Sequence, residues 1–454
     1  MPYIPNSDAD RAEMLTEIGF NSVDELFQPI PQELQVKGPL AIDPGLTELE
    51  LRQHLTELGS WNRPAGCRPC FLGGGTYDHD WPALVDHLQS RTEFLTAYTP
   101  YQPECSQGTL QWIYEFQSMI AEICGCEIAN ASMYDGASAA AEAVMMACSI
   151  KRKKRVVVSA GLHPDARATI ATYVKHLDIE VVEAPLVDGV TSWGDTVNGD
   201  TAAVLVQQPN FLGAVEDLDA VTAQAAAHDA LSVCSLYPVA TGLLRSPGKA
   251  GVDIVVGDGQ SLGVPMGYGG PHFGFFATRE TFVRQLPGRL VGESVDTEGR
   301  RAFTLTFATR EQHIRREKAT SNICTNNALI ALRVCIHMAA LGPQGLEEVA
   351  CVSRQRALEL AEALTGATEA VQLAFPDRPF FNEVAFRATG GDAAVQRFKQ
   401  ALAEAEIAGV VAVSQWYPEL DGVFTLACTE KVRPEHIQRL AQVAAASFQM
   451  EVAL

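Results

Sequence analysis

The chain has 454 residues, of which 47% are hydrophobic, and a formal net charge of −21. This length predicts more than one domain, and the excess of acidic residues argues against nucleic-acid binding, which needs a basic face. No apolar run is long enough to span a bilayer, and the N-terminal residues lack the basic-then-apolar pattern of a signal peptide. We therefore expect a cytoplasmic protein that binds neither a membrane nor nucleic acid.

The eleven cysteines lie mostly in apolar settings, which is typical of buried, reduced thiols in a cytosolic protein. Cys67 and Cys70 form a single CxxC pair, and the second pair that a zinc site would need does not follow at a regular spacing. We therefore expect no metal site.

Helical patterns dominate the N-terminal region. Residues 7–19 predict a capped amphipathic helix that ends at Gly19, and residues 46–58 repeat the helical spacing of apolar side chains. Because strand signals are scarce, we expect residues 1–75 to form a helical arm and not an independent domain.

Two irregular stretches follow, FLGGGTYDHDWP (71–82) and FLTAYTPYQPECSQGT (94–109), and then a helix over 110–124. Long irregular segments inside a compact domain are usually functional or disordered, and the aromatic residues argue against disorder.

The stretch NASMYDGASAAAEAVMMA (130–147) predicts a turn at Asp135-Gly136 and a helix of small residues, with Ser138 as a candidate cap. The free N–H groups at such a helix start suit a phosphate. On this stretch alone, close packing of the small residues is the favoured interpretation.

Strands and helices alternate in the middle of the chain. The predicted strands are 156–159, 179–183, 203–207, 231–236, 253–256 and 273–277, with helices at 163–176 and 217–229. This alternation predicts an α/β domain with a mostly parallel sheet and a ligand at the carboxyl ends of the strands. We place this large domain at residues 76–325.

The C-terminal residues 326–454 follow another pattern and predict a small α+β domain. Helices are expected at 325–341, 343–364, 392–405 and 434–447, and strands near 383–388, 410–413 and 423–428.

Four stretches, in this order, resemble motifs of the glycine cleavage system P-protein family: TAYTPYQPECSQGTLQ, NASMYDGASAAAEAVMMA, GYGGPHFGFFA and TREQHIRREKATSNICT. The resemblance covers nearly the whole chain and is closest to subunit 1 of the two-subunit bacterial form. It implies the architecture of a fold type I transferase dependent on pyridoxal phosphate (PLP). It also implies a subunit of glycine dehydrogenase (decarboxylating), which removes CO2 from glycine and transfers the aminomethyl group to the lipoyl cofactor of H-protein.

The resemblance further implies that this chain lacks the PLP lysine. Ser261 stands in the lysine's place, after Gln260, and a hydroxyl cannot form the covalent link. The strand 231–236 also has Cys234 or Ser235 where the family needs an acid against the pyridine nitrogen. We therefore expect PLP on the partner subunit and not covalently on this chain, and we assign no residue here as catalytic.

A remnant cofactor pocket is implied by the residues that match the family's other PLP contacts. The phosphate-type turn is kept as Asp135, Gly136, Ala137 and Ser138. His163 stands where the family places a ring-stacking residue, and a capping or surface histidine before Pro164 is an equal alternative.

The resemblance implies an obligate partner, the lysine-bearing subunit 2, in an α2β2 assembly. The residues expected at the partner's active site or interface are Tyr98, Thr99, Tyr101, Gln102 and Glu104, with Tyr268, Gly269, Gly270 and His272 close to the partner's phosphate. Interface packing alone is an equal alternative for the tyrosines.

Four basic residues are candidates to line the approach of glycine or of the lipoyl-lysine: Arg310, His313, Arg315 and Arg316. Their spacing also fits a charged helix face.

Two alternatives to this function stay open. One is a self-sufficient PLP enzyme that brings Lys249 or Lys318 into the site. The other is a binding or regulatory scaffold that contributes nothing to catalysis and holds an anion in the remnant pocket.

Overall fold

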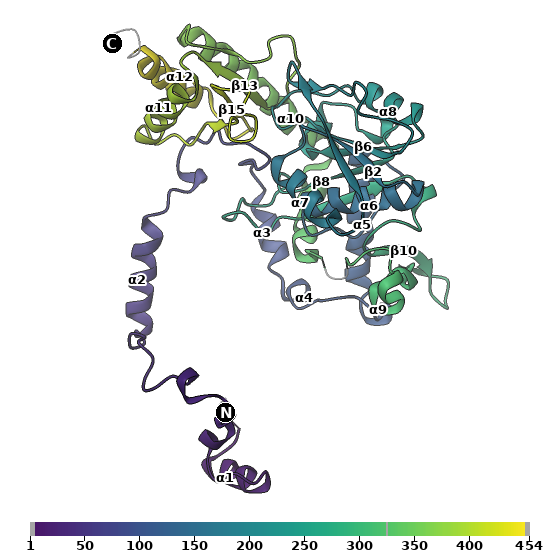
Figure 1. Ribbon diagram of the computed structural model, residues 1–454, viewed down its shortest axis with the longest axis vertical. Helices are drawn as coiled ribbons and strands as arrows, with labels where there is room; N and C mark the ends of the chain where they lie inside the picture. Colours follow the sequence, from purple (N-terminus) through teal and green to yellow (C-terminus); the bar gives the residue numbers. More distant parts are fainter. Residues whose placement is uncertain (1–4, 324–325, 450–454) are drawn as a thin grey trace. The chain divides into compact units, whose positions relative to one another are not determined.

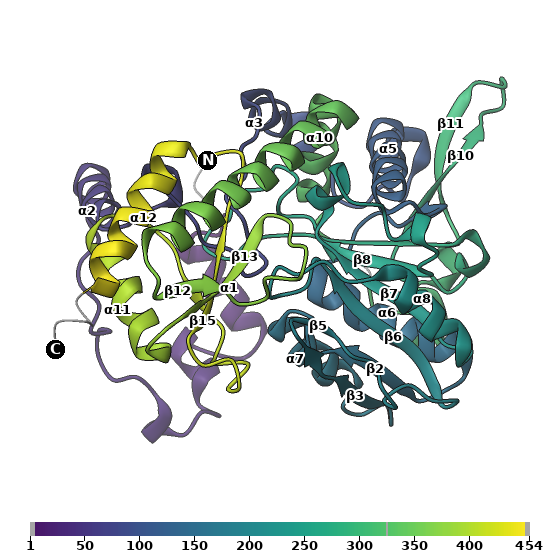
Figure 2. The ribbon, with the colours of Figure 1, turned by 90° about the horizontal axis from the view of Figure 1, so that it is seen from above.

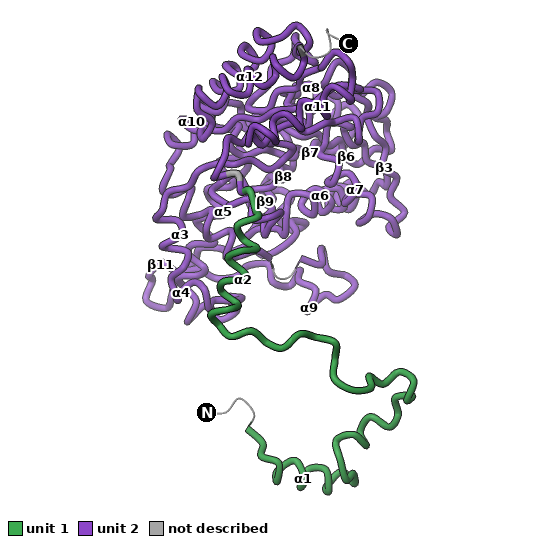
Figure 3. The backbone as a smooth tube through the Cα atoms, turned by 90° about the vertical axis from the view of Figure 1, so that its left-hand side faces the viewer, with its two compact units in different colours: residues 1–63 green, residues 64–454 purple. Residues whose placement is uncertain are grey.

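The computed structural model describes residues 5–323 and 326–449 and divides the chain into two compact units, residues 1–63 and residues 64–454 (Figure 3). The first unit holds α1 (Asp8–Glu17) and α2 (Glu48–Ser60), which match the helices predicted over 7–19 and 46–58. Each begins at a capping box, in which an N-cap hydroxyl and an acidic side chain three residues later satisfy each other's backbone N–H groups.

The main sheet of the second unit has seven strands in the order β1-β9-β8-β7-β6-β2-β3. The five from β8 to β3 are parallel, whereas β9 is antiparallel to β8 and β1 is antiparallel to β9. The strands are β1 (Ile128–Ala129), β2 (Arg155–Ser159), β3 (Glu180–Ala184), β6 (Thr201–Gln208), β7 (Leu231–Leu236), β8 (Ile254–Asp258) and β9 (Gly274–Thr278). The predicted α/β sheet is therefore confirmed.

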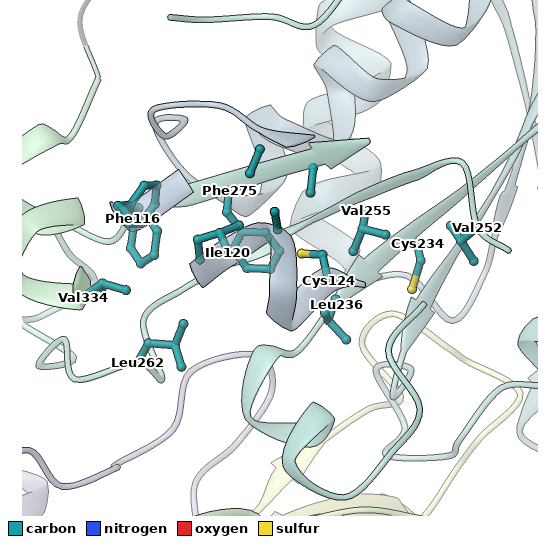
Figure 4. Packing of buried hydrophobic residues seen from close by; sticks show 14 of the residues in the cluster. Phe116, Ile120, Cys124, Cys234, Leu236, Val252, Val255, Leu262, Phe275 and Val334 are labelled. Carbon is teal, nitrogen blue, oxygen red and sulfur yellow. The ribbon is translucent and has the colours of Figure 1, made fainter. Parts of the chain in front are cut away.

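Helices lie on both faces of this sheet (Figures 1 and 2). They include α5 (Gln107–Cys124), α6 (Gly136–Lys151), α7 (Pro164–Val174) and α8 (Leu218–Ala227). In β8, Val255 packs into the same cluster as Phe116 and Ile120 of α5 (Figure 4), whereas Ile254 and Val256 pack into a second cluster with α6. Because successive strand side chains face opposite sides, a sheet covered on both faces needs an apolar residue at every position.

A second, four-stranded antiparallel sheet lies near the C-terminus, in the order β12-β13-β15-β14. Its elements are β12 (Val371–Leu373), β13 (Glu383–Ala388), α11 (Gly391–Glu404), β14 (Val411–Ala412), β15 (Val423–Ala427) and α12 (Pro434–Gln449). Phe386, Phe398 and Phe424 centre a hydrophobic cluster of its own. The domain limits at residues 75 and 325 stay predictions, and residue 325 lies outside the described residues.

The longest helical stretch, α10 (Ala328–Ala367), consists of two helices that meet at Gly342, whose φ of 64° is not helical, and Pro343. This matches the two helices predicted there. By length and composition α10 could cross a membrane. Its buried residues, such as Leu332 and Leu360, instead belong to two of this unit's hydrophobic clusters.

The structure departs from the sequence prediction in three places. The hairpin β10 (Leu290–Val295) and β11 (Arg301–Thr306) was not predicted, because Gly292 and polar residues obscure the strand pattern. The strand predicted over 253–256 runs on to Asp258 as β8, because Asp258 pairs with Gly274 of β9. The irregular stretch predicted over 94–109 is shortened at both ends, by α4 (Thr92–Leu95) and by α5. The remaining short elements are α3 (Ala83–Gln89), α4 (Thr92–Leu95), α9 (Gln312–Arg315), β4 (Leu186–Val187) and β5 (Val190–Thr191).

Glu142 of α6 generates a prediction about stability and pH. Burial raises the pKa of this carboxyl group to about 7, from an ordinary value of 4.5. Between these values the unfolded chain releases the proton more readily than the folded protein, so this group lowers stability as pH rises. Relative to Glu142→Gln, we expect the wild type to lose about 2 kcal/mol of unfolding free energy between pH 5.5 and 8.5. Denaturant unfolding across this range measures the difference, and parallel pH profiles of the two proteins would contradict it.

Candidate functional site

Gln260 fixes the loop after β8 by hydrogen bonds to the backbone. Its side chain accepts a hydrogen bond from the N–H of Tyr77 (3.0 Å) and donates to the carbonyls of Tyr77 (2.9 Å) and Val264 (2.8 Å). Gln260 and Ser261 are only 3% and 4% exposed, and Ser261 Oγ has no hydrogen-bond partner among the described residues. The place proposed for the lysine is therefore a buried position that carries a lone hydroxyl.

The carboxylate of Asp258 lies at the N-terminus of α6. Its Oδ2 accepts from the N–H of Gly136 (3.2 Å), its Oδ1 accepts from the N–H of Gln260 (2.9 Å), and His272 Nδ1 lies 3.7 Å from Oδ1. A Cβ on Gly136 would stand 2.6 Å from the backbone nitrogen of Asp258, so glycine permits this approach. Burial raises the pKa of Asp258, and the nearby His272 and the two N–H groups oppose that rise. An internal anion thus already occupies this helix start.

The cap of α6 is Asp135 and not Ser138, which corrects the sequence prediction. Asp135 Oδ1 accepts from the N–H of Ser138 (2.7 Å), and Ser138 Oγ accepts from the N–H of Asp135 (3.2 Å). The turn formed by Asp135, Gly136, Ala137 and Ser138 is therefore a capping box whose polar groups already have partners.

His163 caps α7. Its Nδ1 accepts from the N–H of Asp165 (3.1 Å), and its Nε2 lies 2.9 Å from the carbonyl oxygen of Gly74, which places the ring proton on Nε2. The ring meets Phe211 edge to face, with centroids 5.0 Å apart, and burial lowers its pKa. These contacts match the capping alternative for this histidine.

The remnant pocket does not fit covalently held PLP. Ser261 offers no amine, and the strand β7 places Cys234, a thiol whose pKa burial raises, where the acid would stand. A phosphate at the start of α6 would meet the carboxylates of Asp135 and Asp258. The backbone N–H groups around this site therefore bond to the chain's own side chains.

A self-sufficient PLP enzyme would need Lys249 or Lys318 near Ser261, and the contacts of both lysines lie elsewhere. Lys249 pairs with Glu122 at 3.5 Å and is 62% exposed, and Lys318 lies in a short 3₁₀ turn. Within residues 5–323 and 326–449, no hydrogen bond or ion pair joins either lysine to Gln260 or Ser261.

A cavity of about 320 Å³ brings together part of the predicted partner-facing set. Its lining includes Tyr98, Thr99, Pro271, Arg289 and Asn327. Tyr98 is 76% exposed, Tyr101 54% and Tyr268 92%. Aromatic side chains this exposed are typical of surfaces that bind a partner.

Arg289 organises the polar side of this cavity. Its guanidinium donates to the hydroxyl oxygens of Tyr101 (2.9 Å) and Thr99 (3.3 Å) and lies 5.2 Å from the centre of the Tyr101 ring. Glu311, which is 7% exposed, lies 3.7 Å from Arg289 Nε and 3.5 Å from His313 Nδ1. A buried ion pair of this kind holds the charged groups in one geometry. Thr99, Tyr101, Arg289, Glu311 and His313 are called the arginine cluster below.

Asn327 connects the cavity to the remnant pocket. Its side-chain amide donates to the carbonyls of Tyr134 and of His272, both at 2.7 Å. The cavity wall therefore rests on the segments that carry Asp135 and His272.

The other predicted residues lie elsewhere. Arg310 donates to the carbonyls of Leu286 and Gly288, so it holds the backbone that leads to Arg289. Arg315 donates to the carbonyl of Thr309 (3.2 Å). Gln102, Glu104, Gly269, Arg315 and Arg316 are exposed, Gly270 is partly buried, and none of these six lines the cavity.

Sequence reasoning missed Arg289, Glu311 and Asp258. Glu311 lies inside the motif TREQHIRREKATSNICT, so a search of that motif for acids as well as bases could have found it. Arg289 lies outside all four motifs, and only the fold brings it to Tyr101.

Solved structures agree with this fold. The structure of a sphingosine-1-phosphate lyase from Burkholderia pseudomallei is 15% identical, with a TM-score of 0.65 over 91% of this chain and 93% of that chain. A glycine decarboxylase (P-protein) of the glycine cleavage system, in inhibitor-bound form, is 45% identical, with a TM-score of 0.88 over 98% of this chain and 100% of that chain. The chain therefore has the fold type I architecture of PLP-dependent enzymes.

The family follows from the sequence comparisons. The glycine cleavage system P-protein model matches residues 1–444. Proteins named as probable glycine dehydrogenase (decarboxylating) subunit 1 are 45% identical in Desulforamulus reducens and 46% identical in Bacillus subtilis, each over 97% of this chain and 98% of the relative. The chain belongs to the glycine cleavage system P-protein family.

The variant Asp258→Ala tests whether this carboxylate serves as the anion at the N-terminus of α6. We expect this change to lower the free energy of unfolding by about 2 kcal/mol, because two backbone N–H groups lose their acceptor. Inorganic phosphate should then raise the melting temperature of the variant more than that of the wild type, because it restores an anion at the helix start.

Thermal unfolding in phosphate and in chloride of equal ionic strength measures this effect. Asp178→Asn is the control, because it removes the charge of an exposed aspartate that pairs with Lys154 (2.7 Å) and keeps a residue type that tolerates the φ of 55° at this position. An equal response of Asp258→Ala and the wild type to phosphate would contradict the assignment.

Proposed function

We propose that this chain is the subunit of glycine dehydrogenase (decarboxylating) that does not carry PLP, and that it completes an active site on a lysine-bearing partner, subunit 2. The enzyme decarboxylates glycine and transfers the aminomethyl group to the lipoyl cofactor of H-protein. The observation that carries the proposal is Ser261, a buried hydroxyl at the lysine's place in a chain that matches the family over residues 1–444.

The partner's PLP would supply the electron sink for the decarboxylation. The relatives' names, which number this chain's homologues as subunit 1, support a second subunit. We propose an α2β2 assembly in the cytoplasm.

The arginine cluster and the exposed tyrosines are the contribution that we propose for this chain. Tyr98 and Thr99 line the cavity, and Arg289 is fixed between Tyr101 and Glu311. A guanidinium held in one orientation suits a carboxylate, such as that of glycine. Tyr268 and Gly269 are exposed in the turn that leads to the partly buried Gly270, which suits the proposed contact near the partner's phosphate.

The proposed division of labour predicts the outcome of a simple labelling experiment. The purified chain, mixed with PLP and reduced with borohydride, should give no stoichiometric covalent adduct by mass spectrometry, because Ser261 has no amine. Exchange of CO2 with the carboxyl group of glycine should appear only when subunit 2 is added. A single adduct on one lysine of this chain, or exchange by this chain alone, would overturn the proposal.

A second prediction separates the active subunit from a passive scaffold. Tyr98→Ala should leave the unfolding temperature of this chain unchanged, because the side chain is 76% exposed, and should lower the exchange rate of the assembled enzyme by about tenfold or more.

The matched control is Leu177→Ala, which removes an apolar side chain that is 46% exposed and lies outside the cavity. Wild-type exchange by the Tyr98→Ala enzyme would favour a scaffold without a catalytic contribution.

A further inference from the structure

A second cavity, of about 240 Å³, lies between the CxxC segment and the residues that lead into α12. We call it the basic pocket and define it by residues 66–70, 78, 431–433 and 436. Its wall includes four basic side chains, Arg68, Lys431, Arg433 and His436. Burial and the neighbouring Arg433 lower the pKa of His436, so this ring is neutral at pH 7. Asp78 is the one acid among the described residues of the wall, which leaves a net charge of +2 in a chain of net charge −21.

The guanidinium of Arg68 has no counter-charge from the chain itself. It makes no hydrogen bond and no ion pair within residues 5–323 and 326–449, and its Nε is buried without an acceptor. A buried N–H group that lacks an acceptor costs free energy, because it has given up its bonds to water. An anion in the pocket would supply the charge and the acceptors that Arg68 does not find in the chain.

The other two cations are paired in different ways. Lys431 Nζ lies 2.8 Å from Asp78 Oδ1, and this carboxylate is 14% exposed, so it holds the ammonium group in place. Arg433 lies 3.2 Å from Glu435, but both side chains are at least 60% exposed, and such surface pairs contribute little. One well-held carboxylate therefore does not neutralise the three cations of the wall.

Hydrogen bonds fix the backbone on both sides of the basic pocket. The N–H of Ala408 donates to the carbonyl of Pro69 (2.9 Å), and the N–H of Phe71 donates to the carbonyl of Ala408 (2.7 Å). The hydroxyl of Thr429 donates to the carbonyl of Asp78 (2.8 Å). The segments that carry the cations are thus in place before a ligand arrives, which reduces the cost of binding.

The size and the charge of the basic pocket indicate the class of ligand. Sites for drug-sized molecules measure about 300–1,000 Å³, so 240 Å³ suits a smaller molecule. A monocarboxylate would neutralise only half of the excess charge, whereas a phosphate group carries about −1.5 to −2 at pH 7. The guanidinium of arginine also presents its N–H groups in a fork that matches the oxygens of phosphate.

We propose that the basic pocket binds a phosphate group, either of inorganic phosphate or of a small phosphate monoester. Arg68 supplies the unpaired charge, and Lys431 and Arg433 flank the anion. The site shares no lining residue with the cavity at Tyr98 and does not involve the start of α6. It is independent of the proposed function.

Calorimetric titration of the full-length chain at constant ionic strength tests the proposal, with inorganic phosphate and with glycerol phosphate as probes. We expect saturable binding by the wild type. Arg68→Gln should raise the Kd about tenfold or more, because it removes a charge-assisted contact with the anion. Its unfolding temperature without phosphate should match that of the wild type, because Arg68 makes no hydrogen bond within the described chain.

A second variant, Arg433→Gln, should also raise the Kd. The matched control is Arg245→Gln, because Arg245 is likewise an exposed arginine that pairs with an exposed acid, Asp219 at 2.6 Å, and it lies outside the pocket. Each substitution removes one positive charge. We expect the control to change the Kd by about twofold or less, because its charge is remote and screened by salt.

Cys67 gives a second readout that does not depend on a variant. Its thiol is exposed and lines the pocket, whereas Cys105 and Cys351 are exposed outside it. Alkylation by iodoacetamide, followed by mass spectrometry of the peptides, reports each thiol separately. Phosphate at about ten times its Kd should slow the alkylation of Cys67 about threefold or more and leave the other two thiols unchanged, because the bound anion covers the pocket.

The two probes identify the source of the phosphate group. Tighter binding of glycerol phosphate would support a phosphorylated metabolite as the ligand, and tighter binding of inorganic phosphate would support the free ion. Three outcomes would overturn the proposal: no saturable binding by the wild type, a wild-type Kd for both Arg68→Gln and Arg433→Gln, and an equal loss of binding in Arg245→Gln. None of these measurements uses glycine–CO2 exchange, so their failure leaves the proposed function intact.

Discussion

The backbone N–H groups at the start of α6 require a negatively charged or polar acceptor, and the identity of that acceptor determines what the fold can do. In this chain Asp258 supplies it, from the end of the neighbouring strand β8, with His272 at 3.7 Å. This carboxylate already accepts a hydrogen bond from the helix start, and its negative charge would repel a phosphate placed there. Gln260 and Asp135 likewise accept hydrogen bonds from nearby backbone N–H groups, so the chain's own side chains supply the acceptors in this region.

A second group of polar side chains lies around the cavity at Tyr98. Arg289 lies between Tyr101 and Glu311, so its charge is oriented before any ligand arrives. Such preorganisation reduces the cost of binding an anion. Asn327 joins the cavity wall to the backbone at His272, so the cavity and the start of α6 belong to one hydrogen-bonded framework.

The sequence by itself determined most helices and strands of the second unit and the mostly parallel main sheet, because periodicity and capping residues are local properties. The resemblance to the family, and not a local pattern, implied the missing amine at Ser261. The family motifs also made Tyr98, Tyr101 and His313 candidate site residues. The tertiary structure alone decided that Asp258 reaches Gly136, 122 residues away, and that Arg289 reaches Tyr101 across 188 residues. It also decided that β10 and β11 form a hairpin. These contacts arise where separate elements pack together, and no spacing along the chain encodes which side chains will meet there.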